Sequence, residues 1–409
     1  MNYEAAYQKV KEFGQEHILK YYEELTEAEQ AALLAQIEKT DFSVLTQIES
    51  AQAGAAERGK IQPIYVMKVD EIKEKEARFK EIGVEALKAG KVGAVLLAGG
   101  MGTRLGSDDP KGMYDIGLTK TLYIFECLVN NMMAVVNEVG AWFPLYIMTS
   151  ERNNESTVRF LEEKNFFGYN KDYVHFFTQE MAPASDYTGK AYMEEKGRIA
   201  TSPNGNGGWF SSMERCGILD KVHESGVEYL NVFGVDNVLQ KIYDPYFVGA
   251  VIDEKVAVGA KVISKNAPDE RIGVMCLEDG RPSIIEYYEL TDELMNAKDE
   301  KGKPAYEFGV ILNYLFEVKA LEEIAAKKLP LHTVEKKINY LDEEGNLVKP
   351  EEPNGYKYEN LILDMIQMLD TCLPYEVIRE SEFAPIKNKT GIDSVESARE
   401  LLKLNHVEL

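Results

Sequence analysis

One segment of the sequence constrains the fold more than any other, an uninterrupted apolar run at residues 92–98 that leads into glycines. Such a run is typical of a strand that is buried on both faces of a parallel sheet. Shorter apolar runs at 145–148, 174–177 and 229–235 are separated by stretches with helical periodicity. Because strands alternate with helices, the sequence predicts an α/β fold with a doubly wound, mainly parallel central sheet and helices on both faces.

The chain is expected to have three parts. Residues 1–90 have helical periodicity among many Glu, Gln and Lys residues, and they are predicted to form an N-terminal helical segment. A capping box from Thr26 to Glu29 marks the start of its second helix. Residues 91–325 are expected to form the central sheet domain, and residues 326–409 a small C-terminal α/β part.

The pattern changes after about residue 271, where antiparallel pairs are predicted. Asp279-Gly280 is a turn signal between two strand-like runs, 271–277 and 283–288, so Glu286 and Tyr287 are expected to lie on a strand. A second hairpin is expected around Gly345. Three elements are predicted near the end of the chain: a helix at 359–369, an extended segment at 375–378, and a last helix that Asp393 opens.

The strongest chemical signal follows the first strand directly. This loop contains the glycines Gly99, Gly100 and Gly102. Glycine lets the backbone come close to a ligand and turn its N–H groups towards an anion. The dinucleotide-binding fingerprint is not met, since Leu105 takes the place of its third glycine, and no Gly-Lys-Ser/Thr of a P-loop follows. Arg104 can bind two phosphate oxygens at once and Lys111 adds a point charge, so the loop predicts a phosphate site.

The composition excludes several classes of protein. Lys+Arg 46 against Asp+Glu 69 gives a net charge of −23, which argues against a partner that is a nucleic acid polymer or an anionic membrane. The four cysteines are far apart and the five histidines have no ligand spacing, so neither a zinc site nor a disulfide framework is indicated. The sequence has no secretory signal and no apolar run long enough for a membrane span, so a cytoplasmic location is expected.

A family resemblance is carried by several motifs between about residues 90 and 390. Residues 97–106, followed by Pro110-Lys111-Gly112, resemble the signature of the eukaryotic-type UDP-sugar pyrophosphorylases. The likeness continues through Tyr146-Ile147-Met148-Thr149-Ser150, Phe176-Phe177-Thr178-Gln179, Val235-Asp236-Asn237 and Phe383-Ala384-Pro385-Ile386-Lys387-Asn388. The Asn-Gly-Asn-Gly-Gly stretch at 204–208 is similar to the acetylhexosamine branch of the family. The resemblance implies a Rossmann-like, GT-A-like nucleotidyltransferase fold with a catalytic central domain.

The resemblance also implies roles for individual residues. Catalysis is expected from Arg104, Lys111 and Lys387. UTP is expected to contact Leu97, Ala98, Gly99, Gly100, Gly102, Thr103, Lys111, Gln179, Gly205, Asp236 and Lys357. The sugar phosphate is expected to contact Asn206, Gly273, Glu286, Tyr287 and Lys387. Lys357 and Lys387 would be the contribution of the C-terminal part to the site.

Asp236 attracts attention by its position as well. It follows a predicted strand, and open α/β sheets bind ligands outside the carboxyl ends of their strands. A carboxylate there can hold Mg²⁺, which prefers oxygen ligands and bridges substrate phosphates. With the resemblance, this predicts a Mg²⁺-dependent uridylyltransferase that joins UTP to a hexosamine 1-phosphate and releases a UDP-sugar and pyrophosphate. A monomer is the default expectation.

Two other classes and a sugar ambiguity stay open at this point. A glycosyltransferase would usually have Asp-x-Asp after the strand, where this chain has Asp236-Asn237-Val238. A nucleotide-sugar sensor without activity would be expected to have lost Arg104 or Lys111, and both are present. In the acetylhexosamine branch an asparagine that contacts the sugar stands where this chain has Val310. Preference could therefore shift among the 1-phosphates of GlcNAc, GalNAc, glucose and galactose.

Overall fold

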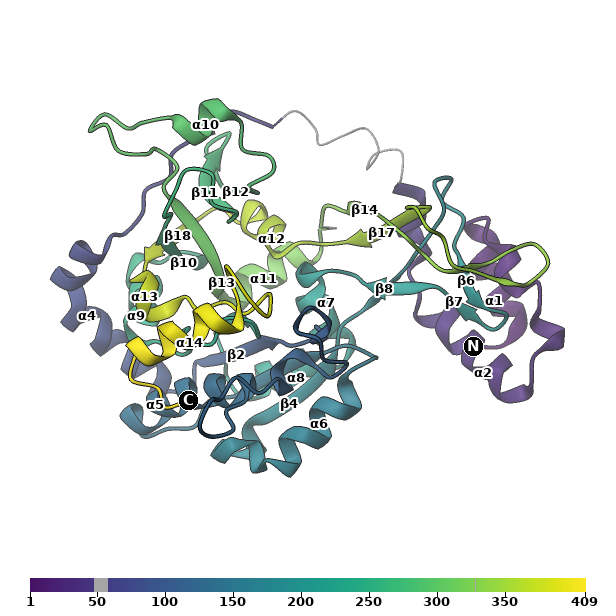
Figure 1. The fold of residues 1–409 in the computed structure, drawn as a ribbon, viewed down its shortest axis with the longest axis horizontal. Coiled ribbons are helices and arrows are strands. Elements are labelled where there is room, and N and C mark those ends of the chain that lie inside the picture. Colours follow the sequence, from purple (N-terminus) through teal and green to yellow (C-terminus); the bar gives the residue numbers. More distant parts are fainter. Residues whose placement is uncertain (48–57, 328) are drawn as a thin grey trace. The chain divides into compact units, whose positions relative to one another are not determined.

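A computed structural model describes residues 1–47, 58–327 and 329–409 of the chain (Figure 1). It contains two compact units, each built from three stretches of sequence: 1–58, 180–208 and 328–364 in the smaller one, and 59–179, 209–327 and 365–409 in the larger one. Residues 48–57 of the predicted helical segment lie outside the described residues. The division into three parts at residues 90 and 325 is based on sequence pattern and stays a prediction.

The larger unit contains a ten-stranded sheet among the described residues. Its strands are β1 (Ile61–Gln62), β2 (Val92–Leu97), β3 (Leu145–Thr149), β4 (Val174–Thr178), β9 (Tyr229–Gly234), β10 (Val258–Ser264), β11 (Val274–Glu278), β12 (Arg281–Ile285), β13 (Phe308–Glu317) and β18 (Cys372–Glu376). The main path runs β1-β11-β13-β9-β2-β3-β4, with β10 beside β13 and β18, and β12 beside β11. The strands β9, β2, β3 and β4 are parallel neighbours, and all four were predicted as strands.

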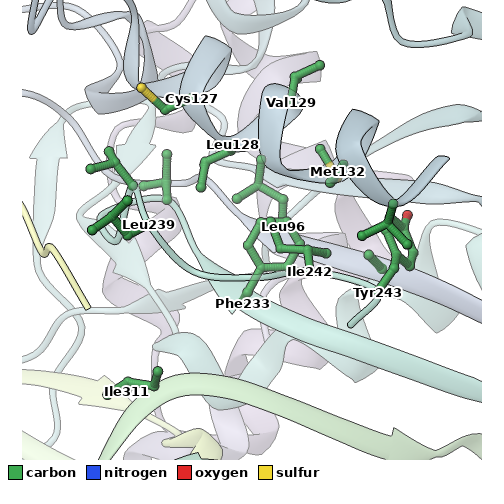
Figure 2. Packing of buried hydrophobic residues seen from close by; sticks show 14 of the residues in the cluster. Leu96, Cys127, Leu128, Val129, Met132, Phe233, Leu239, Ile242, Tyr243 and Ile311 are labelled. Atoms are coloured by element: carbon green, nitrogen blue, oxygen red, sulfur yellow. The ribbon is translucent and has the colours of Figure 1, made fainter. Parts of the chain in front are cut away.

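Helices cover both faces of this sheet. They are α4 (Val69–Lys88), α5 (Ile124–Val139), α6 (Asn154–Glu163), α7 (Trp209–Arg215), α8 (Ile218–Glu224), α9 (Pro245–Glu254), α10 (Asp292–Asn296), α11 (Val318–Ala325), α13 (Arg379–Glu382) and α14 (Val395–Leu404), with α12 (Ile362–Met368) beginning in the smaller unit. On one face, Leu128 and Met132 of α5 belong to the same buried cluster as Leu96 and Phe233 of the sheet (Figure 2). The α/β class with a mainly parallel central sheet is confirmed.

The opposite face of the sheet has its own helix contacts. Leu315 of β13 belongs to the buried cluster between α5 and the sheet. The next residue, Phe316, points to the opposite face of the sheet. The ring of Phe316 lies 6.0 Å from the ring of Trp209 on α7. Because both faces of the central strands are covered, β2 is buried at all six positions, as its continuous apolar run predicts.

The smaller unit combines helices with short antiparallel strand pairs. Its elements are α1 (Tyr3–Glu12), η1 (Glu16–Leu19), η2 (Tyr22–Glu24), α2 (Glu27–Lys39), η3 (Phe42–Gln47), β5 (Met181–Pro183), β6 (Met193–Glu195), β7 (Arg198–Ile199), β8 (Thr201–Pro203), η8 (Asn206–Gly208), β14 (His332–Lys336), β15 (Tyr340–Leu341), β16 (Leu347–Val348) and β17 (Gly355–Glu359). The predicted capping box of Thr26 and Glu29 opens α2. Val10, Leu33 and Tyr358 share one core, which unites segments far apart in the sequence.

The hairpin predictions are confirmed. Asp279 and Gly280 connect β11 and β12 with φ angles of 50° and 83°, the left-handed conformation that a two-residue turn needs. A second antiparallel pair, β15 with β16, flanks Gly345, whose φ is 84°. The antiparallel strand β13, ten residues long, was not predicted although it lies between β9 and β11.

Three predicted elements near the C-terminus have different limits. The helix expected from 359 begins at Ile362, because Glu359 pairs with His332 as the last residue of β17. The extended segment expected at 375–378 is β18, which begins at Cys372 and ends at Glu376. The last helix is capped by Ser394, whose hydroxyl accepts from Ser397 N, and not by Asp393.

None of the helices in the described ranges combines the length and the apolar character that crossing a bilayer requires.

Candidate active site

The glycine loop follows β2 and folds back on itself. Gly102 N donates a hydrogen bond to Asp109 O at 2.8 Å, and Lys111 N donates to Gly100 O at 3.1 Å. Leu105 is 2% exposed and anchors the middle of the loop in the core. These contacts bring Lys111 back to the glycines, so the two halves of the predicted phosphate site are adjacent.

The two cations of the loop differ in exposure. Arg104 lies on the short helix η4 (Thr103–Leu105) and is exposed. Lys111 opens η5 (Lys111–Met113) and is partly buried. A Cβ at the following residue, Gly112, would lie 2.3 Å from the ring of Phe125, so only glycine lets η5 pack this closely on α5.

The first two glycines of the loop have different neighbours. A Cβ at Gly99 would lie 2.6 Å from Nε2 of Gln179, whereas a Cβ at Gly100 would meet no atom within 4 Å. Among the hydrogen bonds of the described residues, none uses the backbone N–H of Gly99 or Gly100. The loop therefore leaves open space and amide donors for an anion at Gly100, with the buried amide of Gln179 packed beside it.

Three charged side chains of the predicted site act on the ammonium of Lys111. Burial lowers the pKa of the Lys111 ammonium, the carboxylate of Asp236 acts in the opposite direction, and Arg104 and Lys387 lower the pKa further. Electrostatic coupling of this kind requires short separations. Arg104, Asp236 and Lys387 thus act on one ammonium, although they lie up to 283 positions apart in the sequence (387 minus 104). Three cations and one carboxylate suit a ligand that carries several negative charges.

Lys387 is held in place by its surroundings. Its Nζ lies 3.0 Å from Oδ2 of Asp393, and its backbone N donates to Asp393 O at 2.7 Å. The preceding residue, Ile386, donates from its backbone N to Asp236 O at 2.9 Å. The segment that carries Lys387 therefore runs along the turn that follows β9.

Three of the residues predicted to bind the sugar, Gly273, Glu286 and Tyr287, lie at one end of the β11–β12 hairpin. Gly273 and Glu286 are opposite one another, and a Cβ at Gly273 would come within 3.3 Å of Oε1 of Glu286. Burial raises the pKa of Tyr314 on β13, and the charge of Glu286 adds to this rise. Glu286 itself is half-buried. Tyr287 is 41% exposed, and its ring lies 5.3 Å from that of Tyr288.

The expectation that Glu286 and Tyr287 lie on a strand is wrong. β12 ends at Ile285. The chain then turns, because Glu289 N donates to Glu286 O at 2.9 Å and Glu286 N donates to the Glu289 carboxylate at 3.1 Å.

Val310, the departure from the family pattern, belongs to the same region. Its backbone N donates to Gly273 O at 2.9 Å. Asn313 is fully buried, where its amide accepts from Asn231 Nδ2 at 2.8 Å and donates to Lys241 O at 3.1 Å. Since these partners occupy Asn313, it cannot replace an asparagine at position 310.

Three of the predicted site residues, Gly205, Asn206 and Lys357, belong to the smaller unit. Gly205 has a φ of 87°, and a Cβ there would lie 2.3 Å from Asn360 O. Asn206 Oδ1 accepts from Ile362 N at 3.0 Å, so part of this side chain supports the start of α12. Lys357 is the central residue of β17, opposite Val334.

One supporting residue of the loop was missed. Asn153 is fully buried, and its Nδ2 donates to Ala98 O at 3.0 Å and, more weakly, to Gly100 O at 3.4 Å. Its Oδ1 accepts from Ser150 N at 2.7 Å. The available signal was an asparagine just after a buried strand, β3, on the edge where the glycine loop lies.

The predicted magnesium site has few donor atoms from the protein itself. Within the described ranges, no group of three or more His, Cys, Asp or Glu side chains is arranged to hold a metal ion. Mg²⁺ does not need such a cage, because it is commonly bound by one or two carboxylates together with substrate phosphates and water. Asp236, beside the open glycine loop, fits the role of the carboxylate ligand that the protein contributes to such a site.

Comparison with known proteins agrees with this arrangement. The profile of the UTP–glucose-1-phosphate uridylyltransferase family matches residues 42–409. Human UDP-N-acetylhexosamine pyrophosphorylase-like protein 1 is 36% identical over 96% of this chain and 82% of its own length. The UDP-N-acetylglucosamine pyrophosphorylase of Saccharomyces cerevisiae is 35% identical over 80% of this chain and 71% of its own.

A solved structure extends the likeness to three dimensions. The uridine diphosphate N-acetylglucosamine pyrophosphorylase of Trypanosoma brucei, crystallised with an inhibitor, has a TM-score of 0.83 at 27% identity. The match covers 98% of this chain and 84% of that one. The family resemblance predicted from the motifs is confirmed, and the chain belongs to the UTP–glucose-1-phosphate uridylyltransferase family.

Proposed function

We propose that this uridylyltransferase joins UTP to N-acetylglucosamine 1-phosphate with Mg²⁺, forming UDP-N-acetylglucosamine and pyrophosphate. The observation that carries the proposal is the open glycine loop, which folds back so that Lys111 lies beside Gly100 while the segment of Lys387 contacts Asp236. The choice of sugar follows the name of the yeast relative, a UDP-N-acetylglucosamine pyrophosphorylase, whereas the name of the human relative gives only an N-acetylhexosamine. The sequence and the geometry thus favour the same substrate pair.

The proposed reaction is an in-line displacement. A phosphate oxygen of the sugar phosphate attacks the α-phosphorus of UTP, a new P–O bond forms, and the bond to the β-phosphate oxygen breaks with its electron pair leaving on pyrophosphate. No general base is needed, because a phosphate monoester with a second pKa of about 6 is already ionised near neutral pH. Positioning and charge neutralisation therefore carry most of the rate.

The protein groups divide the work by position. Arg104, Lys111 and the amides of Gly99 and Gly100 would neutralise the triphosphate and the departing pyrophosphate. Lys387 would bind the incoming sugar phosphate. Asp236 would hold Mg²⁺, which supplies positive charge to the phosphates when bound.

The sugar assignment has a specific competitor. Val310 replaces an amide by an isopropyl group, which removes a donor and an acceptor beside Gly273. A pocket without that amide would discriminate less between acetylated and plain hexoses. A broader UDP-sugar pyrophosphorylase that also uses glucose or galactose 1-phosphate is therefore the second candidate.

Pyrophosphate release tests the function. The protein is incubated with UTP, Mg²⁺ and, in parallel, the 1-phosphates of GlcNAc, GalNAc, glucose and galactose. We expect the highest kcat/KM with GlcNAc 1-phosphate, and comparable values for several sugars would favour the broader enzyme. Arg104→Ala should lower kcat at least tenfold, because the triphosphate loses the guanidinium that can bind two of its oxygens. No release with any of the four sugars would reject the assignment.

A further inference from the structure

The side chain of Asn237, the residue after Asp236, pairs with the backbone of a distant segment. It is 3% exposed. Its Nδ2 donates to Glu382 O at 2.7 Å, and its Oδ1 accepts from Ala384 N at 2.9 Å. One amide thus binds the carbonyl of the last residue of α13 and an N–H just beyond that helix, 145 and 147 positions away.

Backbone contacts on each side of Asn237 continue this pairing. Val238 N donates to Ala384 O at 3.3 Å, and Ile386 N donates to Asp236 O at 2.9 Å. Lys387 is the next residue along. The hydrogen bonds around Asn237 therefore link the predicted metal ligand to the predicted sugar-phosphate lysine.

A buried charge cluster fixes the far end of the same segment. The carboxylate of Glu382 lies 2.6 Å from Nζ of Lys261, which also lies 2.8 Å from Asp244. Lys261 is fully buried. Burial alone would lower the pKa of Lys261, but the two carboxylates outweigh it and raise the pKa, so the ammonium stays charged. A compensated cluster of this kind holds its members in a single arrangement, because separating one partner leaves a buried charge unpaired.

We propose that Asn237 is a positioning residue for Lys387: it holds the segment 382–387 against the turn that carries Asp236, and so fixes where the lysine starts from. The inference rests on the proposed function, because it takes Lys387 as the residue that binds the sugar phosphate. It also explains why an amide follows Asp236 instead of a second carboxylate. A carboxylate has no N–H to donate to the carbonyl of Glu382.

A double-mutant cycle of Asn237→Ala and Lys387→Ala tests the inference. Asn237→Ala alone should lower kcat/KM for the sugar 1-phosphate at least tenfold and change KM for UTP less. In the Lys387→Ala background, Asn237→Ala should lower kcat/KM for the sugar 1-phosphate less than twofold, because there is no longer an ammonium to position. A purely structural role of Asn237 would lower the rate by the same factor in both backgrounds.

Asn231→Ala is the matched control. Asn231 is 1% exposed and also bonds through its amide, to Asn313 and Tyr314 O, without reaching the segment 382–387. It should lose thermal stability but keep the wild-type rate when folded. If Asn237→Ala does not fold, Asn237→Ser takes its place, with folding of each variant checked by thermal unfolding.

Two outcomes separate the inference from the proposed function. Equal losses in both backgrounds, or a wild-type rate for folded Asn237→Ala, would overturn the positioning role while the enzyme assignment stands. A wild-type protein that releases no pyrophosphate from any of the four sugar 1-phosphates would overturn the proposed function, and the positioning role with it.

Discussion

Burying a charged group costs free energy unless an oppositely charged partner compensates it, and Lys261 is an example of such compensation. Burial raises the pKa of the Asp244 carboxyl, but the ammonium of Lys261 outweighs this and holds that pKa below its ordinary value. The same ammonium also faces Glu382. Truncating Lys261 would leave two carboxylates buried at neutral pH, which is typically worth about 3–5 kcal/mol of lost stability.

This cluster predicts a pH-dependent mutational effect. In Lys261→Met the pKa of Asp244 should rise above its ordinary value, so the native state binds more protons than the unfolded state as the pH falls. The stability of the variant should therefore approach that of the wild type between about pH 7 and pH 5. Urea unfolding of both proteins at several pH values measures the difference.

The control for this prediction is Lys241→Met. Lys241 lies 3.6 Å from Glu382, but its side chain is 58% exposed, so the pair is expected to contribute less than about 1 kcal/mol. A loss of stability in Lys261→Met that is constant with pH would contradict the assigned charges.

At the scale of elements, two glycines decide how closely α4 and α9 pack. A Cβ at Gly83 would lie 1.8 Å from Pro245 O, and a Cβ at Gly249 would lie 1.8 Å from Phe79 O. Each helix therefore presents a glycine to the backbone of the other. The helical periodicity of residues 1–90 predicts helix in this part of the chain, but the need for Gly83 becomes visible only when the partner helix is in place.

Gly83→Ala should destabilise the protein although alanine is the better helix former. The propensity gain is about 1 kcal/mol, whereas forcing a methyl group against a backbone carbonyl typically costs about 1–3 kcal/mol and more when nothing can shift. We expect a lower Tm in thermal unfolding. Glu81→Ala on the exposed side of α4 should leave Tm nearly unchanged. An increase of Tm in Gly83→Ala would mean that the two helices are not in contact here.

For the whole molecule, the net charge of −23 opposes both compactness and the binding of anions. The predicted phosphate site offsets the repulsion of anions with local cations. Arg104 and Lys387 act on Lys111, while acidic residues outnumber basic ones in the chain as a whole. The net charge therefore argues against a nucleic acid polymer as a ligand, but it does not argue against a single nucleotide.

The charge predicts a response of stability to salt. Screening reduces repulsion among carboxylates once the Debye length falls from about 30 Å at 0.01 M to about 10 Å at 0.1 M salt. Tm at pH 7 should therefore rise by a few degrees over this range of NaCl. A decrease in Tm over the same range would show that attractive ion pairs outweigh the repulsion.

Local sequence pattern accounts for much of the architecture. The runs at β2, β3, β4 and β9 read as buried strands because each is short, apolar and followed by a turn, and the glycine loop follows from the residues at 99–106. By contrast, β13 was missed, because Gly309 and Asn313 divide its apolar residues into short runs that do not form one continuous signal. The cap at Ser394 was missed in favour of its neighbour Asp393, since either residue type can begin a helix.

The α/β class, the glycine loop and the family could be predicted from the sequence, because these depend on residues that are neighbours in the chain. Only the tertiary structure decided which distant residues meet. It placed Lys387 beside Asp236 through the backbone and amide contacts of Asn237, and it assigned Asn313 to the core. The physical reason is that hydrogen bonds and buried charges are satisfied across the fold, by partners that sequence spacing does not specify.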